Sequence, residues 1–244
     1  MERIKVTDIS GCYGNLQVLD GISLSAGKDQ LVSIIGPSGC GKSTLFNIIS
    51  GLIKPCKGKV IIDGQDYTGK LGRVGYMHQK DLLLPWKTII DNICIPLVIQ
   101  GKSIKQARIK VKPYFQIFGL DSFEYKYPPQ LSGGMRQRAA LLRTYMFKSD
   151  IMLLDEPFGG LDAITKLKMQ EWLMGVTQKL KSTILFITHD IDEAIFLSDK
   201  IYLLSERPAK VNRVFHVNID RPRDNRVFTS SNFNNLKKEI LKHL

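Results

Sequence analysis

Three short runs of mostly apolar residues dominate the hydropathy pattern of the chain. They lie at residues 31–35, 151–154 and 183–187. Each run is short and lacks the polar alternation of a surface strand, which is typical of strands buried on both faces of a sheet. Polar residues follow each run, and ligands of open α/β sheets bind at that edge. The pattern therefore predicts an α/β fold with a ligand site where these strands end.

Other segments of the chain have different periodicities. Residues 3–10 and 16–24 alternate between apolar and polar positions, which predicts two strands with one exposed face. A further strand is predicted at residues 72–79. From about Thr88 to Phe147 the pattern becomes helical, and glycines or prolines interrupt it. This stretch is predicted to be a helical insertion in the α/β domain.

A glycine-rich loop joins the first buried run to a helix that contains Thr44. The loop residues are Gly36-Pro37-Ser38-Gly39-Cys40-Gly41-Lys42-Ser43. The glycines let backbone N–H groups wrap around a polyphosphate, and the positive end of the helix faces the same anion. Lys42 adds a charge for the outer phosphates, and the Ser43 hydroxyl is a ligand for Mg²⁺. The arrangement of strand, loop and helix predicts a site for nucleotide phosphates.

Polar side chains capable of acid–base or metal-binding chemistry follow the other predicted strands. Asp155 and Glu156 end the second buried run. A cation or a proton relieves their mutual repulsion, so Asp155 suits Mg²⁺ and Glu156 suits the polarisation of an attacking water. His189 follows the third run, and Gln79 ends the strand predicted at 72–79. Taken alone, each of these last two residues is equally consistent with a structural or solvated side chain.

A second anion site is predicted where a long helix begins at Ser132-Gly133-Gly134. Ser132 is a suitable N-cap, and the two glycines expose backbone N–H groups at the positive end of the helix. A capped helix with no ligand explains the same residues. Tyr13, between Cys12 and Gly14, is placed ahead of the phosphate loop, where its ring either stacks on a purine base or packs on the surface.

The apolar segment Asp81-Leu82-Leu83-Leu84-Pro85-Trp86 also leaves two possibilities open. If Leu83 and Trp86 are exposed, the segment is a docking surface for a partner protein. If they are buried, it is a loop packed on the core.

Charge and cysteine content narrow the class of protein. Lys and Arg outnumber Asp and Glu by 35 to 23, which gives a formal charge of +12. The basic residues are spread along the chain, which favours a positive surface near a membrane or a nucleotide over a nucleic-acid site. No apolar run approaches the roughly 20 residues that span a bilayer, and the N-terminus lacks the apolar stretch of a signal peptide, so we expect a cytosolic protein.

The four cysteines are predicted to be reduced thiols. They stand at positions 12, 40, 56 and 94, with no metal-ligand spacing. Cys40 lies inside the phosphate loop, next to N–H donors and Lys42. If it is accessible, we expect it to react fastest with a maleimide and to be protected by ATP.

Together the motifs resemble the ATP-binding subunits of ABC transporters over about residues 3–210. They are, in order, the loop at 36–43, Gln79, Leu131-Ser132-Gly133-Gly134-Met135, Asp155-Glu156, Asp162 and His189. The resemblance implies a phosphate-loop NTPase core with a mixed central sheet, an N-terminal antiparallel β subdomain and an inserted helical subdomain. It implies these boundaries: a core at 1–87 and 149–215, a helical subdomain at 88–148 and a C-terminal extension at 216–244.

The resemblance also implies a role for each motif. Tyr13 would stack on adenine, the loop from Gly36 to Thr44 would hold the phosphates of ATP through Lys42, and His189 would hold the γ-phosphate. Glu156 would be the general base. The ligands of Mg²⁺ would be Ser43, Gln79 and Asp155, and Gln79 would also link the metal site to the membrane partner. Two copies would close head to tail, so that Ser132, Gly133, Gly134 and Asp162 complete nucleotide sites.

Shorter motifs are similar to the importer branch that handles nitrate, sulfonates, taurine and thiamine-precursor pyrimidines. They are Leu83-Leu84-Pro85-Trp86, Asp192-Glu193-Ala194 and Ser205-Glu206-Arg207-Pro208-Ala209. The likeness implies transmembrane permease subunits and a second copy of the chain as partners, with an extracytoplasmic solute-binding protein acting indirectly. It implies a cytoplasmic, peripheral position on the inner face of the cell membrane and no nucleic-acid partner.

Two other classes of ATP-binding protein compete with this hypothesis. A DNA-repair type of ABC ATPase carries a very long heptad insertion, and only residues 43–131 separate the two motifs here. A phosphate-loop kinase of small molecules needs no Ser-Gly-Gly helix. The sequence thus predicts an ATP-hydrolysing motor of a membrane importer, with an uncoupled ABC-type ATPase or a kinase as the alternatives. It does not name the solute.

Overall fold

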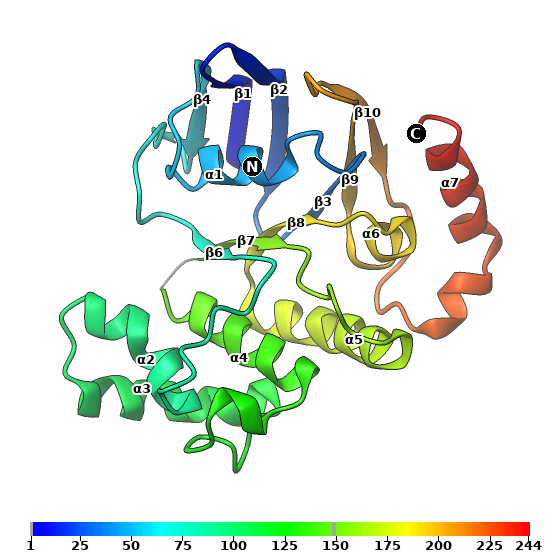
Figure 1. The fold of residues 1–244 in the computed structure, drawn as a ribbon. Coiled ribbons are helices and arrows are strands. Elements are labelled where there is room, and N and C mark those ends of the chain that lie inside the picture. Colours follow the sequence, from blue (N-terminus) through cyan, green and yellow to red (C-terminus); the bar gives the residue numbers. More distant parts are fainter. Residues whose placement is uncertain (1, 148–149) are drawn as a thin grey trace. The chain divides into compact units, whose positions relative to one another are not determined.

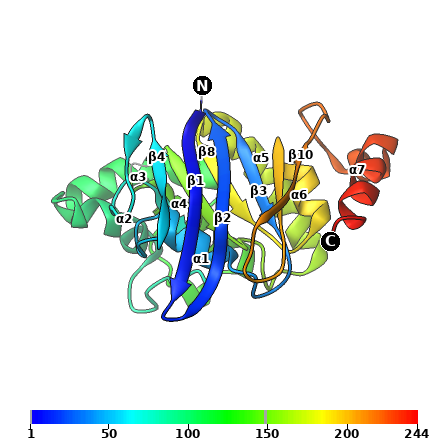
Figure 2. The ribbon, with the colours of Figure 1, turned by 90° about the horizontal axis from the view of Figure 1, so that it is seen from above.

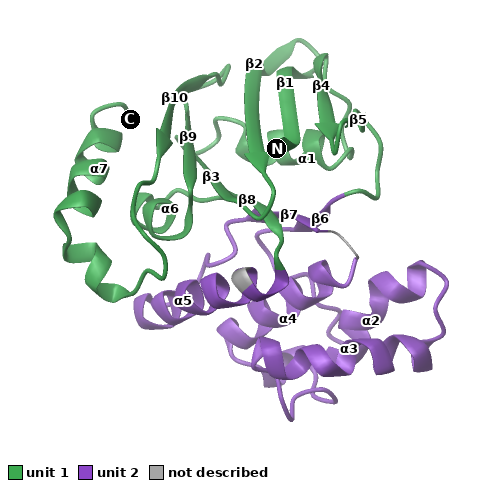
Figure 3. Cartoon of the chain, turned by 180° about the vertical axis from the view of Figure 1, so that it is seen from behind, with its two compact units in different colours: residues 1–73, 181–244 green, residues 74–180 purple. Residues whose placement is uncertain are grey.

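A computed structural model describes residues 2–147 and 150–244. The boundary expected between residues 148 and 149 lies outside the described residues. The chain forms two compact units, shown in Figure 3. Unit 1 consists of residues 1–73 and 181–244, and unit 2 consists of residues 74–180. The finer division into functional subdomains stays a prediction.

Unit 1 contains an antiparallel sheet with the strand order β2-β1-β4-β5. Its strands are β1 (Glu2–Tyr13), β2 (Leu16–Gly27), β4 (Lys57–Ile62) and β5 (Gln65–Asp66). Figure 2 shows β1 and β2 as two long neighbouring strands. Both alternating segments are therefore strands, as predicted. Asp63 and Gly64 both have positive φ, 49° and 79°, which suits the tight turn between β4 and β5.

The buried apolar runs of unit 1 form parallel strands. β3 (Leu31–Ile35) lies between β8 (Thr183–Ile187) and β9 (Lys200–Leu204) and is parallel to both, whereas β10 (Val211–His216) is antiparallel to β9. Every residue of β3 and β8 is buried. Strands covered on both faces have no polar face, which explains the unbroken runs.

The remaining elements of unit 1 are short helices, of which α1, α6 and α7 are labelled in Figure 1. They are α1 (Lys42–Ile49), α6 (Ile191–Leu197), the 3₁₀ helix η2 (Asn225–Thr229) and α7 (Ser231–Leu241). The ring of Phe228 stacks on Phe196 of α6, with 5.0 Å between centroids, and meets Phe233 of α7 at 5.1 Å. These contacts give the C-terminal extension its own apolar anchor.

Unit 2 combines a pair of parallel strands with helices. The strands are β6 (Gly75–Met77) and β7 (Ile151–Asp155). The helices are α2 (Ile89–Ile99), α3 (Ile104–Phe118), the 3₁₀ helix η1 (Pro128–Gln130), α4 (Gly133–Tyr145) and α5 (Ala163–Leu180). The helical character predicted for residues 88–147 is confirmed. Among the described residues, no helix has the length and apolarity needed to span a membrane.

The strand predicted at residues 72–79 is shorter than expected. Only Gly75–Met77 pairs with β7. Gly72 has φ 90°, a conformation outside the β region, so the backbone cannot enter the ladder there. Gln79 consequently lies just beyond the strand, in the connection to the helices of unit 2.

Candidate nucleotide site

The phosphate loop of unit 1 is shaped by contacts that only glycine permits. Gly41, the N-cap residue of α1, has φ 121°. A Cβ atom there would lie 2.7 Å from Val18 Cγ1 and 2.9 Å from Leu19 Cδ2. Because Gly41 has no side chain to cap α1, the first-turn N–H groups of this helix are left for an anion. The loop is thus a backbone cradle of the kind that the sequence predicts.

Lys42 places its ammonium group inside this loop. Its Nζ donates to the carbonyl oxygens of Gly36 at 2.7 Å and Pro37 at 2.8 Å, and the residue is only 7% exposed. Ser43 is exposed and Thr44 is half-buried at the start of α1. The charged group is therefore held among the donors of the loop, where it adds to their attraction for a polyphosphate.

Cys40 does not meet the condition set for rapid alkylation. It is 2% exposed, and its sulfur lies 4.0 Å from Lys42 Nζ. The expectation that this thiol reacts fastest with a maleimide is therefore not supported. The sequence places Cys40 in a loop but does not show that its side chain turns inward, against the backbone of Gly36.

Arg207 is a loop neighbour that the sequence did not single out. Its guanidinium donates a hydrogen bond to the carbonyl oxygen of Gly39. Backbone hydrogen bonds of 2.9 Å join Ala209 to Val18 and Asp20, so the turn that carries Arg207 is fixed beside the loop. Arg207 belongs to a short motif used for the family resemblance. The motif did not predict that its side chain would contact Gly39, because the two residues are far apart in the sequence.

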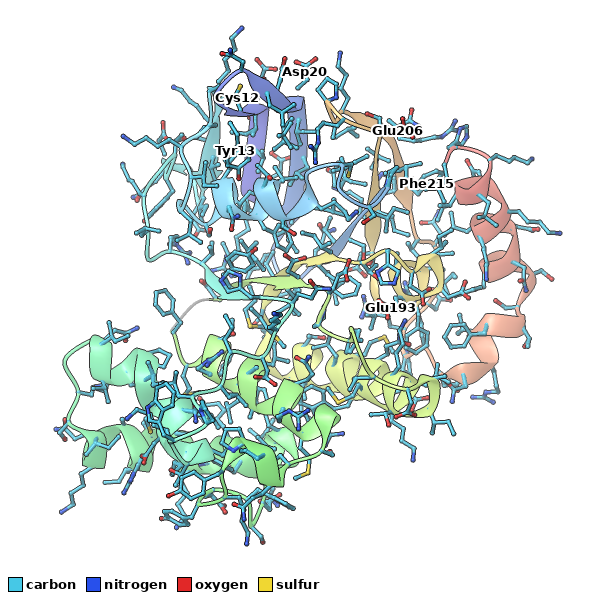
Figure 4. The ribbon with its side chains drawn as sticks, in the orientation of Figure 1. Cys12, Tyr13, Asp20, Glu193, Glu206 and Phe215 are labelled. Carbon is cyan, nitrogen blue, oxygen red and sulfur yellow. The ribbon has the colours of Figure 1, made fainter. Side chains whose placement is uncertain are left out.

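Two further predicted residues belong to unit 1. Tyr13 is the last residue of β1 and is 49% exposed, so its ring can offer a face to a base (Figure 4). His189 is exposed and lies two residues after the end of β8. Its neighbours are fixed, because Thr188 Oγ1 donates to the buried Glu193 carboxylate at 2.5 Å and Asp190 caps α6. Glu193, also labelled in Figure 4, belongs to the Asp192-Glu193-Ala194 motif, but the sequence did not reveal its positioning contact with Thr188.

In unit 2 the structure brings Gln79 and Glu156 together. Gln79 Nε2 donates to Glu156 Oε2 at 3.0 Å. Glu156 has φ 45°, an uncommon conformation for a residue other than glycine, and such backbone conformations persist where the surrounding structure enforces them. The candidate base is therefore oriented both by its backbone and by an amide donor.

Asp155 is the buried member of the carboxylate pair. It ends β7 and is 6% exposed, and the Tyr76 hydroxyl donates to its Oδ2 at 3.4 Å. Burial, and then the negative charge of Asp155, raise the pKa of Tyr76 above its usual value. Tyr76 therefore stays protonated as a donor to the carboxylate. It is a third residue, after Arg207 and Glu193, whose part in the site the sequence did not indicate.

The donor set fits a hard cation such as Mg²⁺. In unit 2, Asp155 offers a carboxylate, and the contact of Gln79 with Glu156 uses the amide nitrogen of Gln79, so its amide oxygen remains as a candidate ligand atom. In unit 1, Ser43 offers a hydroxyl. No group of three or more His, Cys, Asp or Glu converges among the described residues. Mg²⁺ is usually bound by one or two protein groups together with phosphate oxygens and water.

The Ser-Gly-Gly segment has the predicted capped geometry. Ser132 Oγ accepts a hydrogen bond from the Met135 N–H at 3.3 Å. A Cβ atom on Gly134 would lie 3.2 Å from Thr165 Cγ2, so the segment packs closely on the start of α5. Asp162 caps that helix through Thr165 N, at 3.0 Å, and its hydrogen bonds to Thr165 lower the pKa of the Asp162 carboxyl. The two motifs therefore lie beside each other.

The apolar segment 81–86 exposes a different pair of residues from the pair expected. Trp86 is 71% and Leu82 53% exposed, whereas Leu83 is only 7% exposed and belongs to the core. Arg143 of α4 donates to the carbonyl oxygens of Asp81 and Leu82, at 2.5 and 2.6 Å. The segment is thus both an exposed apolar surface, through Leu82 and Trp86, and a loop anchored on the helix that follows Ser132.

The structure groups the predicted residues in two sets. Unit 1 carries Tyr13, the loop from Gly36 to Thr44, and His189. Unit 2 carries the other set, which is Gln79, Ser132, Gly133, Gly134, Asp155, Glu156 and Asp162.

Comparison with known proteins identifies the family of this chain. The family model for the ABC transporter matches residues 19–159. The chain therefore belongs to the ABC transporter family, as the resemblance of its motifs implied, and its fold is that of an ABC ATPase cassette. It is an ATP-binding ATPase of the ABC type.

Relatives and solved structures agree with this assignment. The chain is 42% identical over 228 residues to the aliphatic sulfonates import ATP-binding protein SsuB of Bacillus thuringiensis subsp. konkukian, covering 93% of this chain and 88% of that protein. It is 43% identical over 208 residues to the formylaminopyrimidine import ATP-binding protein ThiZ of Halalkalibacterium halodurans, covering 85% and 81%. The structure of the dimeric ABC transporter cassette MJ0796 is similar with a TM-score of 0.76 and 30% identity, covering 89% and 100%.

Proposed function

We propose that the chain is the ATP-hydrolysing motor subunit of a membrane importer, working on the cytoplasmic face of the membrane with permease subunits. The observation that carries the proposal is the hydrogen bond between Gln79 and Glu156. It joins the candidate base to the segment that leads into Leu82 and Trp86, the exposed apolar residues of unit 2. Such a link allows a partner bound at that surface to influence the water-activating carboxylate.

The chemistry proposed for this site is attack of water on the γ-phosphate. Glu156 accepts the proton of the water, Lys42 and the N–H groups of the loop stabilise charge on the phosphates, and His189 holds the γ-phosphate. Mg²⁺, held by Ser43, Asp155 and the Gln79 oxygen, supplies neutralising charge when bound. Phosphoryl transfer needs little covalent chemistry from a protein, so correct placement of these groups is the main requirement.

The second anion site at Ser132 supports a head-to-tail dimer. Ser132 caps the Met135 N–H at the start of α4, and the other N–H groups of this first turn can bind an anion. A cassette structure similar to this one is dimeric. In the proposed dimer, Ser132 and Gly134 of one copy close over the ATP bound by Lys42 of the other. Each copy then contributes to both sites.

A mixing experiment tests this arrangement. A Ser132→Arg chain is combined with a Lys42→Ala chain, which leaves one composite site with both motifs intact and one with neither. Heterodimers, isolated through two different affinity tags, should bind one ATP, whereas each homodimer should be inactive in hydrolysis. Heterodimers that bind no ATP would contradict the head-to-tail arrangement.

The solute class is proposed from the relatives. SsuB and ThiZ are named for the import of aliphatic sulfonates and of formylaminopyrimidine. We therefore expect a small sulfonate or a pyrimidine thiamine precursor as the cargo, delivered by an extracytoplasmic binding protein. Uptake of both labelled compounds by cells with and without this chain is the measurement. Release of inorganic phosphate without dependence of uptake on the chain would indicate an ABC ATPase that is not coupled to transport.

A further inference from the structure

Helix α3 of unit 2 has a buried face and an exposed face. The buried face consists of Ala107, Val111, Phe115 and Phe118. The ring of Phe118 meets Trp172 of α5 edge-on, with 5.6 Å between centroids. Figure 3 shows α3 beside α2 at one end of this unit. The opposite face of α3 is exposed, and none of its residues belongs to the candidate nucleotide site.

An apolar row runs along this exposed face. Ile109, Pro113 and Ile117 are spaced four residues apart, so they follow one another on the surface of the helix. Ile109 is 67% and Ile117 37% exposed, although isoleucine is among the residue types that are most often buried. A helix that met only water on this side would carry polar residues at these positions. The fold of unit 2 therefore does not account for the row.

Exposed lysines border the row on both sides. Lys112 is three residues from Ile109 and lies on one side, and Lys110 is three residues from Pro113 and lies on the other. Lys105 extends the row by one turn toward the start of the helix. Within the described part of the chain, these three lysines form no ion pair. Their charges are therefore available to a ligand.

Negative charge is missing from the same face. Helix α3 contains no Asp or Glu. The carboxylate of the neighbouring helix α2, Asp91, is neutralised by Arg108, whose Nε and Nη2 donate to it at 2.9 Å each. Asp121 follows only after Gly119 has ended α3. The exposed face thus combines uncompensated positive charge with exposed apolar groups.

We propose that this face of α3 binds anionic phospholipid headgroups at a membrane surface. An apolar row between lysines suits the boundary of headgroups and acyl chains, because the isoleucines enter the apolar layer while the ammonium groups reach the phosphates. A nucleic-acid backbone offers the same negative charge but no apolar layer for the row, so the observations favour lipid. The contact requires no permease and does not rest on the proposed function.

Binding of the full-length chain to vesicles without permease tests the proposal. Vesicles of phosphatidylcholine alone and vesicles with about a third of phosphatidylglycerol are compared by co-sedimentation. The chain should bind the anionic vesicles and leave the neutral ones free, and the affinity should fall as salt screens the lysines. Equal binding to both kinds of vesicle, or binding to neither, would overturn the proposal.

A triple variant locates the binding on α3. It carries glutamine in place of Lys105, Lys110 and Lys112, which removes charge but keeps long side chains that favour a helix. A lysine near an anionic surface contributes about a fivefold factor, so the affinity for anionic vesicles should fall by about a hundredfold. Phosphate release by the variant should match that of the unmodified chain, which shows that it is folded.

A second triple variant is the matched control. It removes the same charge from unit 1, through glutamine at the exposed positions Lys28, Lys59 and Lys242. Its affinity for anionic vesicles should stay within about threefold of the unmodified chain, because these lysines lie outside α3. Equal losses in the two triple variants would show that total charge causes the binding, and the proposed face would be wrong.

Ile109→Gln separates lipid from other polyanions. It leaves every charge in place but removes the most exposed apolar group of the row, so the affinity for anionic vesicles should fall by about tenfold. Affinity for duplex DNA, measured alongside, should be weaker than affinity for the vesicles and unchanged by this variant. If the chain binds DNA as tightly as the vesicles, and Ile109→Gln weakens neither, the face is a general polyanion site and the assignment to lipid is wrong.

Discussion

The phosphate loop and the carboxyl end of β7 differ in their functional groups, which are backbone N–H groups in the loop and side chains at the end of β7. In the loop the proposed binding groups are backbone N–H donors, held in place by glycine conformations and by close packing of Gly41 on Val18. At the end of β7 the proposed catalytic groups are the side chains of Asp155 and Glu156, which accept hydrogen bonds from Tyr76 and Gln79. The loop should therefore be sensitive to added atoms, and the end of β7 to changes of charge and hydrogen bonding.

The largest effect is expected from Glu156→Gln. The variant keeps the size of the side chain but removes the proton acceptor, so hydrolysis should slow by about a hundred- to ten-thousandfold while ATP binding is nearly unchanged. Phosphate release and equilibrium ATP binding are the two measurements. Because ATP is retained, the variant should also accumulate as an ATP-bound dimer in size-exclusion chromatography.

Glu171→Gln is the matched control for this experiment. Glu171 is a half-exposed carboxylate of α5, and removal of its charge should leave hydrolysis unchanged. Turnover by Glu156→Gln at the rate of this control would show that Glu156 is not the base.

The next largest effect is expected at the exposed apolar surface of Leu82 and Trp86, in the segment that follows Gln79. Changing Leu82 and Trp86 together to serine should weaken assembly with the permease by about thirtyfold or more, since exposed aromatic and apolar residues are typical anchors of an interface. Basal hydrolysis by the isolated chain should remain, because neither side chain is buried in unit 2. Co-purification with the permease and phosphate release measure the two properties.

Leu83→Ala separates docking from folding. Leu83 is 7% exposed, so its truncation should lower the free energy of unfolding by about 2–5 kcal/mol. If the Leu82 and Trp86 variant shows a comparable loss of stability, the segment is part of the core and not a docking surface.

Extra volume in the loop should have a smaller but clear effect. Gly41→Ala places a methyl group against Val18 and Leu19 at a positive φ, so ATP affinity should fall by about tenfold. Gly64→Ala is the control, because Gly64 also has positive φ, 79°, but no atom within 4 Å of the added carbon. Equal ATP affinities of the two variants would show that packing does not shape the loop.

These experiments use contacts that the sequence reveals only in part. The strands β3, β7 and β8 were predictable because burial on both faces leaves an unbroken apolar run. The N-cap role of Ser132 was predictable because capping is local in the chain. The glycine loop was recognisable for the same reason, since its function depends on consecutive backbone groups.

Contacts between distant segments were not predictable in this way. The hydrogen bond of Gln79 to Glu156 depends on the pairing of β6 with β7, and periodicity does not specify strand order. The orientation of neighbouring side chains was also hidden. In the loop 81–86, which has no regular period, the sequence could not show that Leu83 turns inward while Leu82 turns outward.

The smallest effect is expected at Arg207, which tests whether the backbone alone determines the geometry of the phosphate loop. Its exposed side chain donates from outside the loop to the Gly39 carbonyl. If the backbone alone shapes the loop, Arg207→Ala should lower ATP affinity only about threefold, through the lost charge, with hydrolysis at saturating ATP unchanged. Arg207→Lys keeps the charge and should recover most of the affinity, and the effect should shrink as salt screens the exposed group. Affinity and hydrolysis measured at low and high salt separate these cases. A decrease of tenfold or more that Arg207→Lys does not recover and salt does not change would mean that the guanidinium fixes the geometry of the loop, so that a side chain is as important there as at the end of β7.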